Sequence, residues 1–180
     1  NTYGKSKQLA TSYGTTITMS NCHYGWKIDA ETEAAAIVDD IKGGEKVTRD
    51  LNYQYTAASH TGNDYGNSYV EINLTSQHLY LYKNGSLVID SDFVSGNPSK
   101  GNGTHTGVFG VTYTEKNATL KGQNYATPVS FWMPFNGNEG MHDATWRSSF
   151  GGSIYKRNGS HGCVNLPYSV AQTIFENVSA

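Results

Sequence analysis

The sequence predicts a mainly β fold that ends in a helix and is preceded by a small α+β segment. Charged residues make up only 16% of the chain, whereas glycine and tyrosine occur 20 and 13 times. Such a composition favours turns and strands. From about residue 69 onward apolar and polar residues alternate, whereas a helical apolar stripe lies before Gly43-Gly44. The helix before Gly43-Gly44 therefore belongs to the first part of the chain, and the main sheet belongs to the second part.

The first sixty or so residues contain one helix and several short strands. Asp29 is a suitable N-cap, and Glu31 and Glu33 suit the positive end of the helix dipole. Gly43-Gly44 ends the helix after one apolar stripe, which we expect to pack rather than to bind a partner: Ala34, Ile37, Val38 and Ile41. β-branched and aromatic residues predict short strands at 15–19, 26–28 and 47–55.

A polar, glycine-rich stretch between Ser59 and Ser68 has no periodicity and marks a boundary. The chain is thereby divided into residues 1–64 and 65–180. Strand patterns follow at 69–73, 78–83, 87–89, 93–94 and 108–112. Asn84-Gly85 fits a tight type I′ hairpin turn between the second and third of these strands. The second part is therefore a sheet-rich domain.

Two polar loops precede the last elements of the chain, at 137–140 and 148–159. A helix is expected to start near Pro167 and to pack one face on the sheet through Val170, Ala171, Ile174, Phe175 and Val178.

The charge balance and the apolar runs exclude several classes of partner. The 13 basic and 15 acidic residues give a net charge of −2, so nothing indicates nucleic acid or an anionic membrane surface. No stretch approaches the roughly 20 apolar residues that span a bilayer, and no secretory leader is visible at the start. We therefore expect any signal or anchor to lie outside this sequence.

The two cysteines, Cys22 and Cys163, are enough for one disulfide. A fold held together by disulfides, however, normally has a larger, even number of cysteines. A cysteine becomes a nucleophile when a histidine favours its thiolate, and such a cysteine must be free. His161 lies two residues before Cys163, so in an extended segment both side chains would project to the same face. His161 and His142 are therefore both candidate catalytic histidines, although His142 must approach Cys163 through the fold.

The residues around Cys163 suit an acyl-transfer site. Gly162 permits an unusual backbone dihedral, and N–H groups beside it are candidates to bind an oxyanion. Ser160 and Asn165 are expected to orient the histidines or to close the local turn.

His142, seventeen intervening residues and then Ser160-His161-Gly162-Cys163-Val164-Asn165 resemble the signature of the L,D-transpeptidase catalytic-domain (YkuD-type) family. The similarity reaches back through Thr106-Gly107-Val108-Phe109 and the strand pair at 69–83, so that it spans nearly all of 66–180. Many members have proline where this chain has His105, which affects the shape of that loop. The resemblance implies a β-sandwich-like catalytic domain with a C-terminal helix. The segment before it resembles, weakly, part of a peptidoglycan-binding-like domain.

The resemblance also implies a reaction. Cys163 would attack the carbonyl before the terminal D-alanine of a tetrapeptide stem, with His142 as general base. D-alanine would leave a thioester, which an amine of a neighbouring stem resolves to a 3-3 cross-link. Asp143 or a backbone carbonyl would orient the imidazolium. Carbapenem β-lactams would acylate Cys163, and the enzyme would act outside the cytoplasm, in the cell wall or anchored to the membrane.

The substrate-binding set is predicted to comprise Ser160, Gly162, Asn165, Trp146, Met133 and Tyr155. Packing is the alternative for Trp146, Met133 and Tyr155, because aromatic and methionine side chains more often fill cores. No metal or cofactor is expected, since the spacing of Cys163 and the histidines matches no common zinc module.

Two other functions remain open. A cysteine carboxypeptidase or endopeptidase of cell-wall peptides needs the same Cys-His pair but passes the acyl group to water. A non-catalytic peptidoglycan-binding module would use Cys163 only structurally. We take a monomer as the default.

Overall fold

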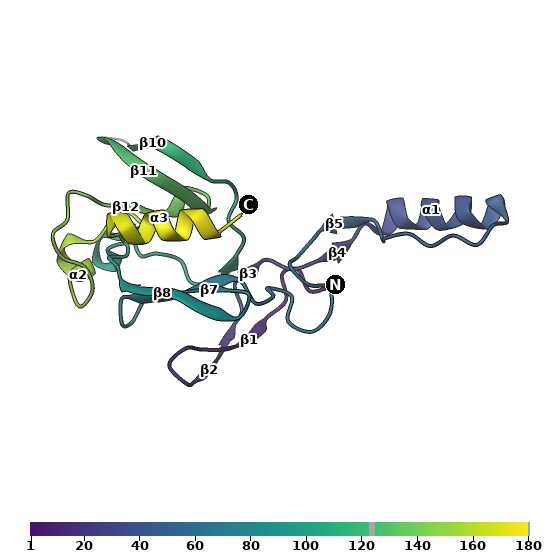
Figure 1. Cartoon of the computed structure of the whole chain (residues 1–180), viewed down its shortest axis with the longest axis horizontal. Helices are drawn as coiled ribbons and strands as arrows, with labels where there is room; N and C mark the ends of the chain where they lie inside the picture. The colour runs from purple at the N-terminus through teal and green to yellow at the C-terminus, as the bar shows by residue number, and fades with distance from the viewer. Residues whose placement is uncertain (123–124, 180) are drawn as a thin grey trace.

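The structure is a computed structural model and describes residues 1–122 and 125–179 (Figure 1). Its elements in chain order are β1 (Lys7–Ala10), β2 (Thr16–Met19), β3 (Cys22–His23), β4 (Lys27–Ile28), α1 (Ala30–Gly43), β5 (Tyr53–Tyr55), β6 (Tyr69–Asn73), β7 (His78–Lys83), β8 (Ser86–Asp92), the 3-10 helix η1 (Pro98–Lys100), β9 (Val108–Phe109), β10 (Glu115–Gly122), β11 (Tyr125–Asn136), β12 (Glu139–Asp143), α2 (Tyr155–Asn158), β13 (Val164–Leu166) and α3 (Tyr168–Asn177).

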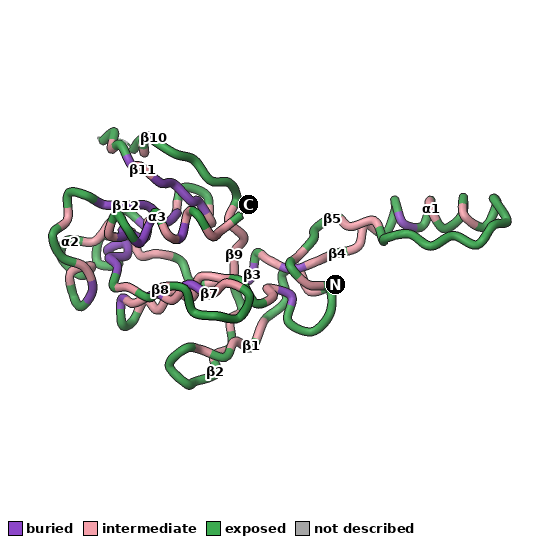
Figure 2. Tube along the Cα trace, in the orientation of Figure 1, coloured by how far each residue is buried: buried purple, intermediate pink, exposed green. Residues whose placement is uncertain are grey.

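Helix α1 begins and ends where the sequence predicts. The Asp29 side chain accepts the Thr32 N–H, and Gly44 adopts a left-handed conformation at φ 69°. The prediction that its apolar stripe packs is wrong, because α1 projects away from the rest of the chain and its apolar side chains are exposed (Figures 1 and 2). The one buried residue of α1 is Glu33, whose carboxylate accepts a hydrogen bond from Arg49 at 3.0 Å.

The first sheet of the larger domain is the antiparallel set β6-β7-β8. Strands β6 and β7 have the predicted bounds, and Ile72 lies opposite Leu79. Asn84 and Gly85 have φ values of 51° and 80°, as a type I′ turn requires. Strand β8 is longer than predicted.

The second sheet has the order β10-β11-β12-β13. Its first three strands are antiparallel, whereas β12 and β13 are parallel with His142 opposite Asn165. The long β10–β11 hairpin was missed from sequence, because β10 is a polar strand in which only Ala118 is buried. The candidate base, His142, lies in β12, and the candidate nucleophile, Cys163, lies directly before β13.

One hydrophobic core lies between the two sheets and α3. It contains Leu79 and Leu81 from β7, Phe131 and Met133 from β11, and three residues of α3, namely Val170, Ala171 and Ile174. Figure 2 shows these buried segments gathered in the larger domain. The predicted mainly β, sandwich-like domain with a C-terminal helix is confirmed.

The first segment contacts the larger domain through a strand pair and through hydrogen bonds to Glu71. β3 pairs in parallel with β9, so that Cys22 lies opposite Val108. The Ser12 hydroxyl donates to the Glu71 carboxylate at 2.6 Å. The division at residue 64 stays a prediction, since these contacts join the two parts. None of the helices among the described residues is long and apolar enough to cross a membrane.

Candidate active site

Cys163 lies directly before β13, and the parallel register of β12 and β13 brings it to the same face as His142. Met141 lies opposite Val164 and His142 opposite Asn165. Side chains alternate along a strand, so Cys163 and Asn165 point to one face, and His142 shares that face across the ladder. Residues 21 positions apart in the sequence are therefore neighbours only because β12 and β13 pair.

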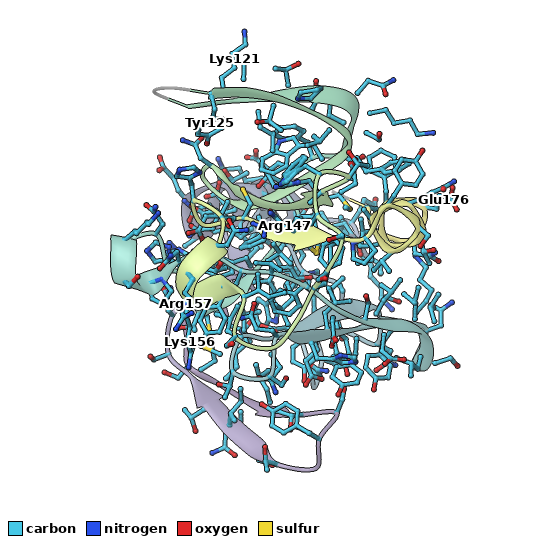
Figure 3. All side chains as sticks on the ribbon, turned by 90° about the vertical axis from the view of Figure 1, so that its left-hand side faces the viewer. Lys121, Tyr125, Arg147, Lys156, Arg157 and Glu176 are labelled. Carbon is cyan, nitrogen blue, oxygen red and sulfur yellow. The ribbon has the colours of Figure 1, made fainter. Side chains whose placement is uncertain are left out.

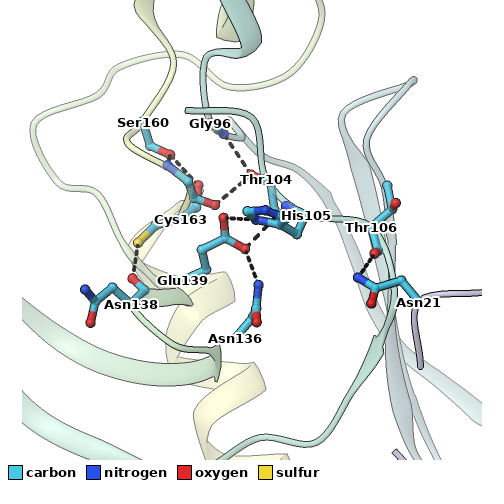
Figure 4. Close-up of polar contacts among 11 residues, drawn as sticks. Asn21, Gly96, Thr104, His105, Thr106, Asn136, Asn138, Glu139, Ser160 and Cys163 are labelled. Atoms are coloured by element: carbon cyan, nitrogen blue, oxygen red, sulfur yellow. Dashed lines mark hydrogen bonds and ion pairs between the residues drawn. The ribbon is translucent and has the colours of Figure 1, made fainter. Parts of the chain in front are cut away.

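The surroundings of Cys163 disfavour the thiolate form. Its Sγ donates a weak hydrogen bond to the Asn138 carbonyl oxygen at 3.5 Å (Figure 4). Burial raises the pKa of the thiol to about 11, although the Gly140 N–H opposes that rise, and the Glu139 charge adds to it. Both cysteines are free, so the open possibility of a Cys22–Cys163 disulfide is wrong.

His142 is buried and held as a neutral imidazole. Its Nδ1 lies 2.8 Å from the Asp143 backbone oxygen, which makes Nδ1 the protonated nitrogen. Burial lowers the pKa of His142, and the positive charge of Arg147 acts in the same direction, whereas the hydrogen bond to Asp143 opposes it. The other nitrogen, Nε2, therefore carries the lone pair that a general base needs.

Asn165 connects His142 to Arg147. In the amide orientation that matches donors with acceptors, its nitrogen donates to His142 Nε2 at 3.1 Å. Its oxygen accepts from Arg147 Nε at 2.8 Å and from Nη2 at 3.2 Å. Asn165 thus orients the histidine, one of the two roles expected for it.

The Asp143 carboxylate does not orient His142, so its assignment as a triad member needs correction. Its Oδ1 accepts the backbone N–H groups of Ser130 and Phe131 at 2.7 and 2.9 Å. The carboxylate is buried and fixes β11 against β12. The group that bonds to the imidazole is the backbone oxygen of Asp143, the alternative left open from sequence.

The turn before the nucleophile is closed by Ser160. Its hydroxyl donates to the Cys163 carbonyl oxygen at 2.5 Å and accepts the Gly162 N–H at 3.1 Å. Gly162 has φ +131°, and a Cβ there would lie 2.9 Å from a carboxylate oxygen of Glu139. This position therefore requires glycine.

Two more predicted residues lie away from the thiol. His161 is exposed and stacks on Tyr125, with ring centroids 5.0 Å apart. The segment bends at 161–162 rather than continuing as a strand, so the argument that His161 and Cys163 share a strand face is wrong. Met133 is fully buried in the core, so its assignment to substrate binding is also wrong.

Trp146 and Tyr155 come from the segment that follows β12. The exposed Trp146 ring lies 5.9 Å from the His142 ring and lines a pocket beside it. Tyr155 begins α2 and is half-buried, with the Lys156 ammonium 5.8 Å above its ring. Trp146 is therefore placed to contact a substrate near His142.

Sequence reasoning missed three residues that border the site. The Trp132 ring lies 6.0 Å from His142 and belongs to the cluster against which Cys163 packs. Glu139 accepts hydrogen bonds from His105 Nδ1 at 2.8 Å and from Asn136 at 3.1 Å (Figure 4). Arg147 bonds to Asn165. These three residues belong to no sequence motif. Arg147, however, lies five residues after His142, and a positive charge so close to the proposed base is a signal that sequence reasoning could have used.

Comparisons with known proteins agree with this geometry. The family model for the YkuD L,D-transpeptidase catalytic domain matches residues 67–180. Among solved structures, a cysteine-to-serine mutant of the Enterococcus faecium L,D-transpeptidase is 34% identical with a TM-score of 0.80, and the match covers 99% of this chain and 73% of that one. No curated protein sequence gave a significant match.

Two further structures are inhibitor adducts. The Ldtfm–avibactam carbamoyl enzyme is 35% identical with a TM-score of 0.83, over 99% of this chain and 71% of that one. The catalytic domain of the E. faecium L,D-transpeptidase acylated by ertapenem is 41% identical with a TM-score of 0.58, over 63% of this chain and 92% of that one. By its fold, its sequence and its Cys-His arrangement, this chain belongs to the L,D-transpeptidase catalytic-domain family.

Proposed function

We propose that Cys163 is the nucleophile of a peptidoglycan L,D-transpeptidase and that His142 is its general base. One observation carries this assignment: β12 and β13 bring both side chains to one face, with the imidazole Nδ1 bonded to a backbone oxygen. That bond leaves Nε2 unprotonated, so its lone pair can take a proton once Asn165 gives up its hydrogen bond there.

The resting pair is neutral, so proton transfer accompanies attack. The thiol leaves the Asn138 oxygen, and its proton passes to His142 Nε2 while Asn165 gives up its bond there. The sulfur bonds to the carbonyl carbon that precedes the terminal D-alanine. As the tetrahedral intermediate collapses, its C–N bond breaks and the imidazolium returns the proton to the departing amine of D-alanine.

The second half-reaction runs through the same two groups. An amine from a neighbouring stem attacks the thioester and loses a proton to His142. The C–S bond then breaks, and the imidazolium reprotonates the sulfur. A 3-3 cross-link results when an amine attacks, and a shortened stem results when water does.

The same nucleophile would react with β-lactams. A relative that is 41% identical is described as acylated by ertapenem, and a second relative as a carbamoyl enzyme formed with avibactam. We propose that Cys163 forms such adducts here. Because the polymer it would cross-link lies outside the cytoplasm, we also propose that the protein acts there, in the cell wall or on a membrane anchor.

Intact-mass spectrometry of the muropeptides tests the assignment. Wild type and Cys163→Ala are incubated with a tetrapeptide-stem disaccharide, with and without a second stem as acceptor. Cys163-dependent loss of D-alanine together with dimer formation supports the transpeptidase. Loss of D-alanine without dimers indicates a carboxypeptidase instead. If neither protein changes the mass of the muropeptides, the result indicates a binding module and contradicts the proposal.

A further inference from the structure

Arg147 carries a positive charge that forms no ion pair with a carboxylate among the described residues. Within residues 1–122 and 125–179, the only side chain to which its guanidinium is hydrogen-bonded is Asn165, and it belongs to no ion pair. The side chain is half-buried, and burial lowers the pKa of Arg147. A guanidinium has five N–H donors, and Asn165 takes only two of them. The remaining donors are available to an anion.

These donors border a pocket next to the catalytic base. Its volume is about 220 Å³, and its lining contains no acidic residue: Trp146, Arg147, Ser148, Ser149, Ile154 and Asn158. The Trp146 ring lies 5.9 Å from the His142 ring, so the pocket adjoins the site of chemistry. Figure 3 shows Arg147 near the centre of this face, with Lys156 and Arg157 nearer its edge.

The two sides of Cys163 have opposite charge. On the Gly162 side lies Glu139, whose carboxylate is already hydrogen-bonded by His105 and Asn136. On the Asn165 side lies Arg147 without an acidic partner among the described residues. A substrate that places a carboxylate on the second side and its scissile carbonyl at the thiol would match this pattern.

We propose that Arg147 binds the terminal carboxylate of the tetrapeptide donor, and so selects a stem that ends one residue beyond the scissile bond. This inference rests on the proposed function and names the substrate group that the pocket recognises. Arginine suits the task, because its planar fork binds a carboxylate through two parallel hydrogen bonds.

The spacing along β13 fits this assignment. Asn165, which holds the guanidinium, lies two residues after Cys163, or about 7 Å along a strand. One residue of peptide spans ~3.8 Å, and a charge-assisted hydrogen bond adds ~2.8 Å. The two lengths are similar, so we expect a carboxylate one residue past the attacked carbonyl to lie near Arg147, whereas a stem extended by another residue would place a neutral amide there.

Binding can be measured without turnover. In the Cys163→Ala background, calorimetry compares a tetrapeptide stem that ends in a carboxylate with the same stem ending in an amide. We expect the carboxylate to bind about 10- to 100-fold more tightly, the range of a charge-assisted hydrogen bond. Adding Arg147→Gln, which keeps a donor for Asn165 but removes the charge, should bring the ratio close to one. Arg157→Gln, a matched change at an exposed arginine of the same segment, should leave the ratio intact.

Turnover separates this inference from the proposed function. The ratio of kcat/KM for the acid and amide donors should be large in wild type and Arg157→Gln and lost in Arg147→Gln, whose Cys163 should still react with iodoacetamide at the wild-type rate. Release of D-alanine from the acid donor and of D-alanine amide from the amide donor at equal kcat/KM would overturn the role of Arg147 and leave the transpeptidase standing. If binding favours the acid stem and depends on Arg147 but neither donor is cleaved, the role of Arg147 stands and the transpeptidase assignment is overturned. An acid preference that survives in Arg147→Gln also overturns the inference.

Discussion

Alkylation of Cys163 should follow a pKa far above that of an ordinary thiol. Burial raises the pKa of this group from 9.0 to about 11. Only the thiolate reacts, so at pH 7 the reactive fraction falls from about 1 in 100 to about 1 in 10,000. The free enzyme should therefore react about 100-fold more slowly with iodoacetamide than a model cysteine peptide does.

The assay is the rate of iodoacetamide modification between about pH 7 and 10, followed by peptide mass mapping so that Cys22 and Cys163 are counted separately. The logarithm of the Cys163 rate should rise with a slope near one and reach no plateau in this range. His142→Gln should leave the profile almost unchanged, because a neutral imidazole does not stabilise the thiolate. Near-UV circular dichroism at each pH serves as the control for folding.

A plateau below about pH 8 in wild type that disappears in His142→Gln would refute this reasoning. It would show that the resting site holds a thiolate and an imidazolium, and that the nucleophile is ionised before the substrate arrives. The expected result instead places deprotonation by His142 within the acylation step.

Three further predictions concern residues around the site and the first sheet. Asp143→Ala should lower the free energy of unfolding in urea by about 2–4 kcal/mol, because one buried and one partly buried N–H group lose their acceptor. Its kcat per folded molecule should fall less than about tenfold, since the imidazole is held by a backbone oxygen; a larger fall with unchanged stability would restore Asp143 to a triad. Met133→Ala should cost about 2–5 kcal/mol of stability and leave the KM for the stem unchanged; a raised KM with normal stability would place Met133 at the substrate. Burial lowers the pKa of His78, but its hydrogen bonds to Asp92 and Asp90 outweigh that effect and raise it above 6.5. Protonated His78 therefore stabilises the fold below that pH, and this stabilisation is lost as the pH rises through the folded-state pKa. In urea titrations His78→Gln should cost stability at about pH 5.5 and little at about pH 9, and an equal cost at both would contradict this account.

Local signals predicted much of the fold. β6, β7, the Asn84-Gly85 turn and both ends of α1 follow from alternation, from a left-handed turn and from capping, each of which acts within a few residues. The β10–β11 hairpin was missed because most β10 side chains face solvent, so the strand carries no alternation of its own. The exposed stripe of α1 shows the converse, since an apolar pattern predicts a buried face but not what covers it.

By itself the sequence pointed to Cys163 as the proposed nucleophile. Cys163 stands in a six-residue motif with His142 upstream, and residue type and order are enough to assign a Cys-His acyl-transfer pair. It also indicated that Gly162 permits an unusual backbone dihedral, and the structure confirms this with φ +131°.

Only the tertiary structure decided which groups serve that pair. The imidazole is held by a backbone oxygen. Because every residue has a backbone oxygen, residue type does not indicate which one takes this role. The Asp143 carboxylate faces β11 instead, and Arg147 reaches His142 through Asn165, because the parallel pairing of β12 with β13 fixes which side chains share a face. Such pairing joins residues far apart in the chain, and the physical rules that act within a few residues do not specify it.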